Sequence, residues 1–235
     1  MTTAPHRTAD DLRQLAEQAG RDLEDATALD VLRWAADTFG RRLCVTSSMA
    51  DAVVAHLAAR AMPGVDVLFL DTGYHFPETI GTRDAVAAVL DVNVVTLTPR
   101  QSVAEQDAQH GPRLHDRDPD RCCALRKVAP LEEGLRDYDA WATGLRRDES
   151  PTRADTPVVG WDSRRQKVKI APIARWTQED VDRYVVEHGV LTNPLLMDGY
   201  ASIGCAPCTR RVLAGEDARA GRWAGLGKTE CGIHR

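Results

Sequence analysis

Short apolar runs alternate with helical patterns along most of this 235-residue chain. The runs are rich in β-branched residues, as buried strands are, whereas the segments between them repeat apolar residues three or four positions apart, as amphipathic helices do. The sequence predicts strands at residues 43–46, 65–70, 92–97, 139–143 and 168–173. Strands that alternate with helices predict crossover connections, so the expected fold class is α/β, with a mainly parallel sheet flanked by helices.

The chain is expected to begin with two helices, within residues 8–39. Thr8 and Asp11 form a capping-box pattern at the start of the first helix. Further helices are predicted at residues 51–60, from Pro77 onward, at 122–135 and at 178–187. Residues 98–120 are polar and residues 146–166 contain prolines, so both segments are predicted to be loops.

Charge and hydropathy exclude some classes of function. The net charge is −5, which argues against a general nucleic-acid binder. Arginine and lysine concentrate in residues 146–169 and 210–235, where most are expected to be solvated and a few to converge on a small anion. The apolar runs are too short to span a membrane, and no basic start precedes an apolar segment. We therefore expect a cytoplasmic protein without a membrane partner.

The cysteines form the most specific pattern. Two tight pairs occur among the six, and they are Cys122 with Cys123 and Cys205 with Cys208. A structural zinc ion takes four thiolates, but zinc ligands are usually two to four residues apart. An iron–sulfur cluster accepts one thiolate per iron, so adjacent cysteines serve it better. The spacing favours a cluster, with zinc and a redox-active dithiol at Cys205 and Cys208 as alternatives. Cys44 lies in a predicted strand and is interpreted as core.

Small polar residues follow the first two predicted strands. Ser47 and Ser48 join the first strand to a helix, where backbone N–H groups bind phosphate well. Asp71 begins an Asp-Thr-Gly turn after the second strand. Because ligands of open α/β sheets bind outside the carboxyl ends of the strands, these turns indicate a nucleotide site. Each turn alone is also typical of an ordinary helix cap or loop.

Cys231 stands near the end of the sequence, in a polar segment. Lys228 and His234 are close to it along the chain, and cationic neighbours favour the thiolate form of a cysteine. A mobile segment that carries a nucleophile can close over a substrate and open to a second partner. The alternative is an incidental exposed thiol.

Together these segments resemble the assimilatory adenylyl-sulfate and phosphoadenylyl-sulfate reductases over residues 30–235. The most specific stretch is Lys-Thr-Glu-Cys-Gly-Ile-His at 228–234, followed by the Arg-Cys-Cys segment at 121–128 combined with Gly-Cys-Ala-Pro-Cys at 204–208. Residues 70–79 and 141–150 also match family motifs. The resemblance implies an adenine-nucleotide α-hydrolase-like fold. The loop at 47–52 lacks the Ser-Gly-Gly-x-Asp-Ser form of the ATP-hydrolysing relatives, which argues against ATP hydrolysis.

The resemblance also assigns roles to residues. It makes Cys231 the nucleophile, and it makes four cysteines the ligands of one 4Fe–4S cluster, namely Cys122, Cys123, Cys205 and Cys208. It places Lys127 between cluster and substrate. The phosphosulfate would be held by Arg219, Arg222 and His234, together with Arg146 or Arg147. The nucleotide pocket would contain Ser47, Ser48 and Asp71.

The implied activity is thioredoxin-dependent reduction of adenylyl sulfate to sulfite and AMP through an S-sulfocysteine, as part of assimilatory sulfate reduction for cysteine biosynthesis. The cysteine pairs mark the iron–sulfur branch of the family. The implied partners are adenylyl sulfate and thioredoxin or a similar dithiol carrier, and a homo-oligomer is possible. We divide the chain into N-terminal helices at 1–40, a nucleotide- and cluster-binding α/β domain at 41–215 and a flexible catalytic tail at 216–235.

Three other functions remain as alternatives. A tRNA-thiolating enzyme uses a similar fold and a cluster, but it would present a broad basic surface. A zinc-stabilised interaction module would be colourless, whereas an iron–sulfur protein is brown. A phosphoadenylyl-sulfate reductase is disfavoured by the cysteine pairs, although use of both substrates is possible.

Overall fold

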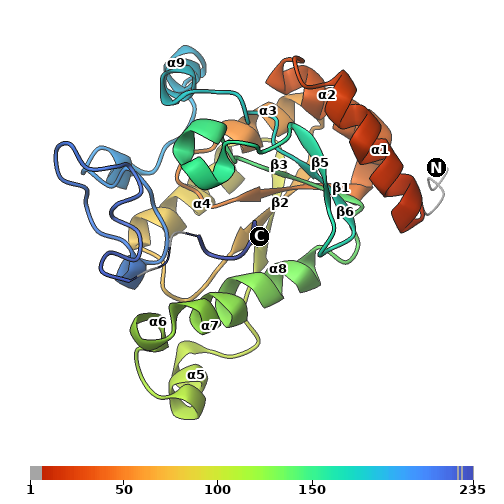
Figure 1. Ribbon diagram of the computed structural model, residues 1–235. Coiled ribbons are helices and arrows are strands. Elements are labelled where there is room, and N and C mark those ends of the chain that lie inside the picture. The colour runs from red at the N-terminus through yellow and green to blue at the C-terminus, as the bar shows by residue number, and fades with distance from the viewer. Residues whose placement is uncertain (1–6, 227, 229, 235) are drawn as a thin grey trace.

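A central sheet organises the computed structural model, which describes residues 7–226, 228 and 230–234 (Figure 1). Within these residues, six strands form one sheet in the order β3-β2-β1-β4-β6-β5. Their bounds are β1 (Leu43–Ser47), β2 (Val65–Leu70), β3 (Val92–Leu97), β4 (Ala140–Thr143), β5 (Val159–Asp162) and β6 (Lys167–Ile170). All neighbours are parallel except β5, which pairs antiparallel with β6 at the edge.

The predicted strands and the mainly parallel sheet are confirmed. The prediction of a loop over residues 146–166 is wrong in one part, because β5 lies within it. This strand is four residues long, contains Gly160 and closely follows Pro157, so it carries little of the apolar pattern that reveals a central strand.

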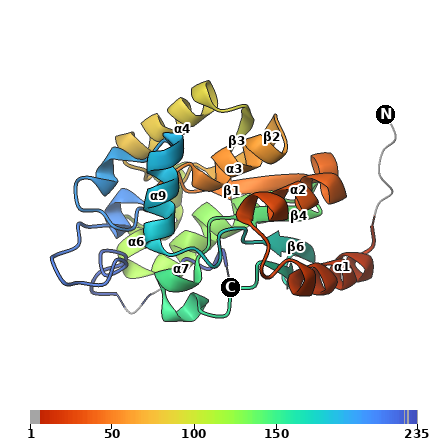
Figure 2. The same cartoon turned by 90° about the horizontal axis from the view of Figure 1, so that it is seen from above.

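Helices cover both faces of the sheet (Figures 1 and 2). The longer ones are α1 (Ala9–Asp22), α2 (Ala28–Phe39), α3 (Val53–Ala61), α4 (Pro77–Val89), α5 (Val103–His110) and α9 (Gln178–His188). The short ones are α6 (Leu114–Arg117), α7 (Pro119–Cys123) and α8 (Ala129–Gly134). In the part of the chain that the structure describes, no helix is both long and apolar enough to cross a membrane.

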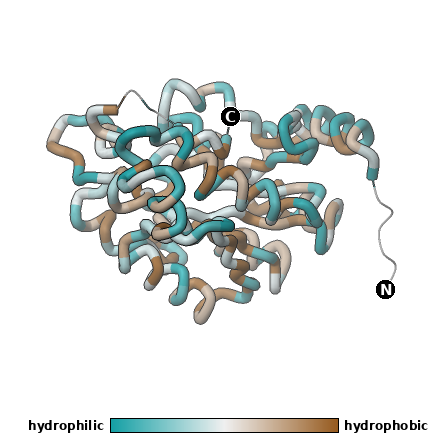
Figure 3. The backbone as a smooth tube through the Cα atoms, turned by 90° about the horizontal axis from the view of Figure 1, so that it is seen from below, coloured by the Kyte–Doolittle hydropathy of each residue, from teal (hydrophilic) through white to brown (hydrophobic). Residues whose placement is uncertain are grey.

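Side-chain alternation along the strands separates two apolar cores. Val45, Val67 and their neighbours pack on one face against α1, α2 and α3. Cys44 and Trp141 point to the opposite face, where α8 covers them. Cys44 is fully buried, so its interpretation as a core residue is confirmed. Figure 3 shows apolar and polar stretches alternating along the outer helices, as two-sided packing requires.

The prediction of a loop over residues 98–120 is wrong, because α5 and α6 lie there. These helices have little apolar periodicity. A capping box between Ser102 and Glu105 starts α5, and the buried amide of Gln106 holds it to the core by accepting a hydrogen bond from Arg126. Tertiary contacts and caps, rather than an apolar stripe, therefore stabilise this segment. The capping box predicted at Thr8 is confirmed.

Chain direction creates a switch point beside β1. The chain runs from β1 outward to β2 and β3, and then returns to place β4 on the other side of β1. The carboxyl ends of β1 and β4 therefore mark a topological switch point, the position at which open α/β sheets bind nucleotides.

Candidate active site

The turn after β1 is held rigidly at this switch point. Ser47 Oγ accepts a hydrogen bond from Met49 N at 3.2 Å, and Met49 adopts a left-handed φ of 58°. Ser48 is exposed. Asp71 follows β2, where its carboxylate accepts from Gly73 N at 3.0 Å. The structure thus brings Ser47, Ser48 and Asp71 to the carboxyl edge of the sheet, as predicted.

Asn193 is a buried support of this turn that the sequence analysis missed. Its side-chain amide donates to Met49 O at 3.1 Å and to Thr79 Oγ1 at 3.1 Å, and its backbone N donates to Ala50 O at 2.9 Å. The side chain is fully buried, so these bonds fix the turn from below. The adjacent Pro194 was the only sequence signal at this position.

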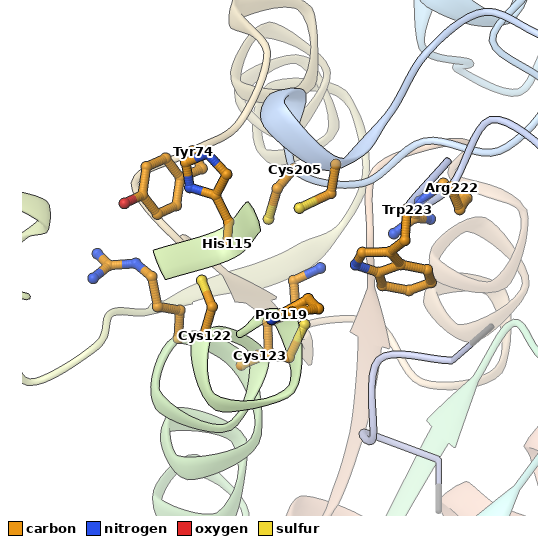
Figure 4. A pocket seen from close by; sticks show the side chains of 11 residues that line it. Tyr74, His115, Pro119, Cys122, Cys123, Cys205, Arg222 and Trp223 are labelled. Carbon is orange, nitrogen blue, oxygen red and sulfur yellow. The ribbon is translucent and has the colours of Figure 1, made fainter. Parts of the chain in front are cut away.

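Four cysteines line one cavity (Figure 4). Cys122 and Cys123 end α7, and the chain continues as a π-helical turn, Ala124–Val128, of the kind often found at functional sites. Cys205 and Cys208 approach from the opposite side, and Ala206 N donates to Tyr74 O at 2.7 Å, which ties their segment to the turn after β2. The two predicted cysteine pairs therefore lie at one cavity, although at least 82 positions of sequence separate them.

Hydrogen-bond donors surround these thiols. Thr72 Oγ1 lies 3.3 Å from Cys205 Sγ. Trp223 also lines the cavity, and its buried indole Nε1 has no hydrogen-bond partner. Burial, reinforced by the neighbouring sulfurs, raises the pKa of Cys122 to about 12 and that of Cys208 to about 11. Four crowded thiols with spare donors fit an iron–sulfur cluster, whose sulfurs accept such bonds. No group of three or more metal-binding side chains among the described residues is arranged around a single ion.

Two cations connect the cysteine cavity to Cys231. Lys127 and Arg222 both line the cavity; Lys127 is buried and Arg222 is partly buried. Burial alone would lower the pKa of Lys127, but the sulfurs of Cys205 and Cys231 outweigh it and raise that pKa above its ordinary value. Arg222 lies over the Trp223 ring at 4.6 Å and donates to Ile203 O at 3.2 Å. Lys127 is thus held charged between the cavity and the Cys231 thiol.

The tail docks across the sheet face that α8 covers (Figure 1). Ile233 packs against the cluster of Cys44, Leu68, Leu131, Leu135 and Trp141. The His234 ring stacks on Trp141 at 5.8 Å with only 5° between the planes. Burial, together with nearby Lys169 and arginines, holds the pKa of His234 well below its ordinary value, so this imidazole is neutral.

Charged residues fix the tail on either side of Cys231. Lys228 Nζ donates to Asp120, beside the cysteine cavity. Glu230 accepts from Arg153 Nε at 2.8 Å and from Arg219 Nη2 at 3.4 Å. Burial raises the pKa of Glu230, but the hydrogen bonds from Arg153 outweigh burial and hold that pKa below its ordinary value. Glu230 is therefore ionised in the docked tail.

The predicted anion-binding residues divide into two groups. Arg219, Arg222 and His234 all lie in the docked C-terminal segment: Arg219 contacts Glu230, Arg222 lines the cysteine cavity and His234 stacks on Trp141. Arg146 instead donates to Gln178 Oε1 at 2.6 Å and pairs with Asp148, and Arg147 pairs with Glu24 at 2.7 Å. Both arginines are thus bonded within the protein, and the structure does not place them in the group around Cys231.

Sequence reasoning missed several residues that line this region. No individual role was predicted for Arg153 and Lys169, which belong to the basic stretch at 146–169. None was predicted for Trp141 and Glu230 either, which lie within segments that match family motifs. A second cavity of about 390 Å³ lies beside the tail. It is lined by the charged side chains of Arg153, Lys169 and Glu230, together with Trp161 and His234. Burial lowers the pKa of Lys169 to about 8.

A nucleotide-type switch point, a four-cysteine cavity and a docked cysteine on a cation-lined tail define a class of α/β protein built for thiol chemistry on an anionic nucleotide. The comparisons agree with this class. The model of the phosphoadenosine phosphosulfate reductase domain matches residues 42–211, and the chain therefore belongs to that family of sulfonucleotide reductases.

Curated relatives extend the match to nearly the whole chain. The adenosine 5'-phosphosulfate reductase of Streptomyces coelicolor is 80% identical over 97% of this chain and 97% of its own length. The protein of the same name from Mycolicibacterium smegmatis is 56% identical over 100% of this chain and 99% of its own length.

Solved structures support the fold. A phosphoadenylyl-sulfate reductase from Candida auris, in a phosphate complex, matches with a TM-score of 0.70 and 26% identity over 87% of this chain and 98% of its own. An FMN adenylyltransferase from Candida glabrata matches with a TM-score of 0.56 and 10% identity, over 88% of this chain and 76% of its own. The second match is one of fold alone, and it confirms the adenine-nucleotide α-hydrolase-like architecture.

Proposed function

We propose that this chain reduces adenosine 5'-phosphosulfate to sulfite and AMP during sulfate assimilation for cysteine biosynthesis, with Cys231 as nucleophile. The observation that carries the proposal is that Lys127, which lines the four-cysteine cavity, is also close enough to Cys231 for the two groups to interact electrostatically. Relatives at 80% and 56% identity that carry the name adenosine 5'-phosphosulfate reductase support the substrate.

In the first half-reaction, the Cys231 thiolate attacks the sulfate sulfur. A sulfur–sulfur bond forms, the bond from sulfur to the phosphate oxygen breaks, and AMP leaves with the electron pair. Lys127, Arg219 and Arg222 stabilise the charge that grows on the leaving phosphate, an effect that is stronger in the transition state than in the ground state. The neutral His234 supplies a hydrogen-bonding ring without adding charge. The product on the protein is an S-sulfocysteine.

In the second half-reaction, a thiolate of a dithiol carrier attacks Cys231 Sγ. Sulfite leaves with the electron pair of the broken sulfur–sulfur bond, and a mixed disulfide forms. The second thiol of the carrier resolves it, which frees Cys231 and leaves the carrier oxidised. Because none of the other cysteines lies near Cys231 in sequence, a separate thioredoxin-like partner is expected to supply the two electrons.

The four-cysteine cavity is proposed to hold one 4Fe–4S cluster through Cys122, Cys123, Cys205 and Cys208. When bound, the cluster supplies a fixed charge beside the substrate. Lys127 then lies between that charge and the phosphosulfate and can hold the sulfate in line with Cys231.

Intact mass spectrometry tests the proposal. Anaerobically purified protein is mixed with adenosine 5'-phosphosulfate in the absence of thiol, with Cys231→Ser in parallel and Cys44→Ala as a matched control that also lacks one cysteine. The parent and Cys44→Ala should gain one SO3 group, Cys231→Ser should gain none, and reduced thioredoxin should remove the group. An unchanged mass on iron-loaded parent protein would exclude this mechanism and favour tRNA thiolation.

The same experiment decides the substrate preference and the metal. The match to a phosphoadenylyl-sulfate reductase makes the 3'-phosphorylated nucleotide the second candidate, so it is offered at equal concentration. Faster adduct formation from that nucleotide would reverse the assignment. Iron and zinc analysis of the same sample, together with its colour, separates a cluster from a zinc ion.

A further inference from the structure

Glu230, the residue before Cys231, is bonded to three other side chains. Both of its carboxylate oxygens are held by Arg153, at 2.8 Å from Nε and 2.9 Å from Nη2. Thr152 Oγ1 adds a third contact at 3.3 Å and Arg219 a fourth at 3.4 Å. The Arg153 and Glu230 side chains are only 12% and 11% exposed. A two-bond pair of this kind fixes both distance and orientation.

Arg153 is itself anchored in the body of the protein. It ends the short helix η4 (Pro151–Arg153), which follows β4, and its other nitrogen pairs with Glu149. The guanidinium therefore bridges a carboxylate of the body and a carboxylate of the tail. The tail position next to Cys231 is thus set by a side chain that does not belong to the tail.

Packing holds Ile233 and His234 further along the tail, but it does little to fix the Glu230 side chain itself. Arg153, Glu230 and Thr152 line the cavity of about 390 Å³, so open space rather than close-packed apolar surface lies beside the pair. A largely buried ion pair contributes little net stability, but removing one partner leaves an uncompensated charge. The Arg153–Glu230 pair consequently selects one tail position more than it stabilises the fold.

We propose that Glu230 and Arg153 are positioning residues that form a latch, which holds Cys231 in its attacking position and opens for the second half-reaction. The inference rests on the function proposed above. Attack on the nucleotide needs the latched tail, because the thiolate must lie beside Lys127. Attack by a dithiol carrier needs Cys231 Sγ to enter the active site of a macromolecule, and because Cys231 is only partly exposed in the docked tail, we expect the latch to open for this step.

The two half-reactions test the latch separately. Iron-loaded parent, Glu230→Gln, Arg153→Ala and the swap Glu230→Arg with Arg153→Glu are compared in single turnovers. Glu230→Gln and Arg153→Ala should slow SO3 uptake about tenfold, without slowing release of sulfite from pre-formed adduct by reduced thioredoxin. The swap should recover part of the uptake rate. Glu216→Gln, which breaks an exposed two-bond pair with Arg210, is the control and should change neither rate.

A second measurement does not depend on catalysis. Trypsin cuts after Lys228, and loss of the peptide 229–235 is followed by mass. Glu230→Gln should lose this peptide about tenfold faster than the parent, and Glu216→Gln at the parent rate. Equal slowing of both half-reactions, no gain from the swap or an unchanged cleavage rate would each overturn the latch. A parent that takes up no SO3, combined with faster cleavage of Glu230→Gln, would instead overturn the proposed function alone.

Discussion

Gly204 leaves space for the guanidinium of Arg222, and Gly204→Ala tests whether that arginine acts on the substrate. A Cβ atom at position 204 would lie 2.1 Å from Arg222 Nη2 and 2.5 Å from its Cζ. Arg222 is a side chain rather than backbone, so it can yield. It is nevertheless partly buried and lies over the Trp223 ring, and its bonds to Ser202 Oγ and Ile203 O, at 3.3 and 3.2 Å, are already long.

The size of the effect follows from this overlap. Ordinary contact begins at about 3.4 Å, so the guanidinium must retreat by about 1 Å. A charge-assisted hydrogen bond is worth about 1.5–3 kcal/mol, and a displacement of that size removes most of it. If Arg222 donates to the phosphosulfate as proposed, SO3 uptake should slow by about 10- to 100-fold.

Single-turnover SO3 uptake at saturating nucleotide measures this loss, and iron analysis of each sample shows that the cysteine cavity is intact. Gly81→Ala makes the same chemical change in α4, where a Cβ would meet nothing within 4 Å, and it should leave the rate unchanged. Gly204→Ala combined with Arg222→Ala should be no slower than Arg222→Ala alone. A normal rate for iron-loaded Gly204→Ala would refute the role given to Arg222.

Three further predictions concern stability, pH and the metal. Arg42→Ala leaves the carboxylate of Asp139, which is only 5% exposed, without its two-bond partner, so it should lower the free energy of unfolding by about 3 kcal/mol. Asp139→Ala leaves an Arg42 side chain that is 30% exposed, so it should lower the free energy of unfolding by only about 1–2 kcal/mol. Urea denaturation followed by circular dichroism checks this order. Because the pKa of docked His234 lies below the ordinary value of 6.5, tail docking is fully stable above pH 6.5 and weakens as the pH falls below 6.5. The rate of tryptic cleavage after Lys228, divided by the rate for a free tail peptide at the same pH, should therefore rise in the parent as the pH falls. The same ratio should not depend on pH in His234→Asn. Cys122→Ser should lose most bound iron and brown colour, and iron retained at the parent level would remove this residue from the ligand set.

The strands of the sheet were predictable because their apolar content is local information. Residues 65–70 and 92–97 were predicted with the bounds that the structure shows, since both segments are short runs dominated by β-branched and other apolar residues, even though β2 is largely buried and the edge strand β3 is not. The helices α5 and α6 were not predicted, because each has one buried residue, Gln106 in α5 and Leu114 in α6, and no apolar stripe. Tertiary contacts of this kind leave no periodic signal in the sequence.

The sequence predicted which residue types form the candidate site better than it predicted where each side chain points. The four cysteines were identifiable because cysteine pairs are rare and chemically specific, and they do line one cavity. Arg146 and Arg147 are adjacent, so their side chains leave the chain in different directions, and each meets an acceptor that is distant in sequence. The latch joins residues 77 positions apart, a distance at which composition carries no information about contact.

Arg219 links the latch to the substrate site, and the geometry suggests an order of events. Glu230 holds Arg153 through two bonds below 3 Å, but its contact with Arg219 is 3.4 Å long. A bound phosphosulfate offers Arg219 a denser negative charge than one shared carboxylate. A substrate that is bound by Arg219 should therefore leave the two Arg153 bonds of Glu230 in place. The tail then stays latched while the nucleotide is held, and opening waits until AMP has left.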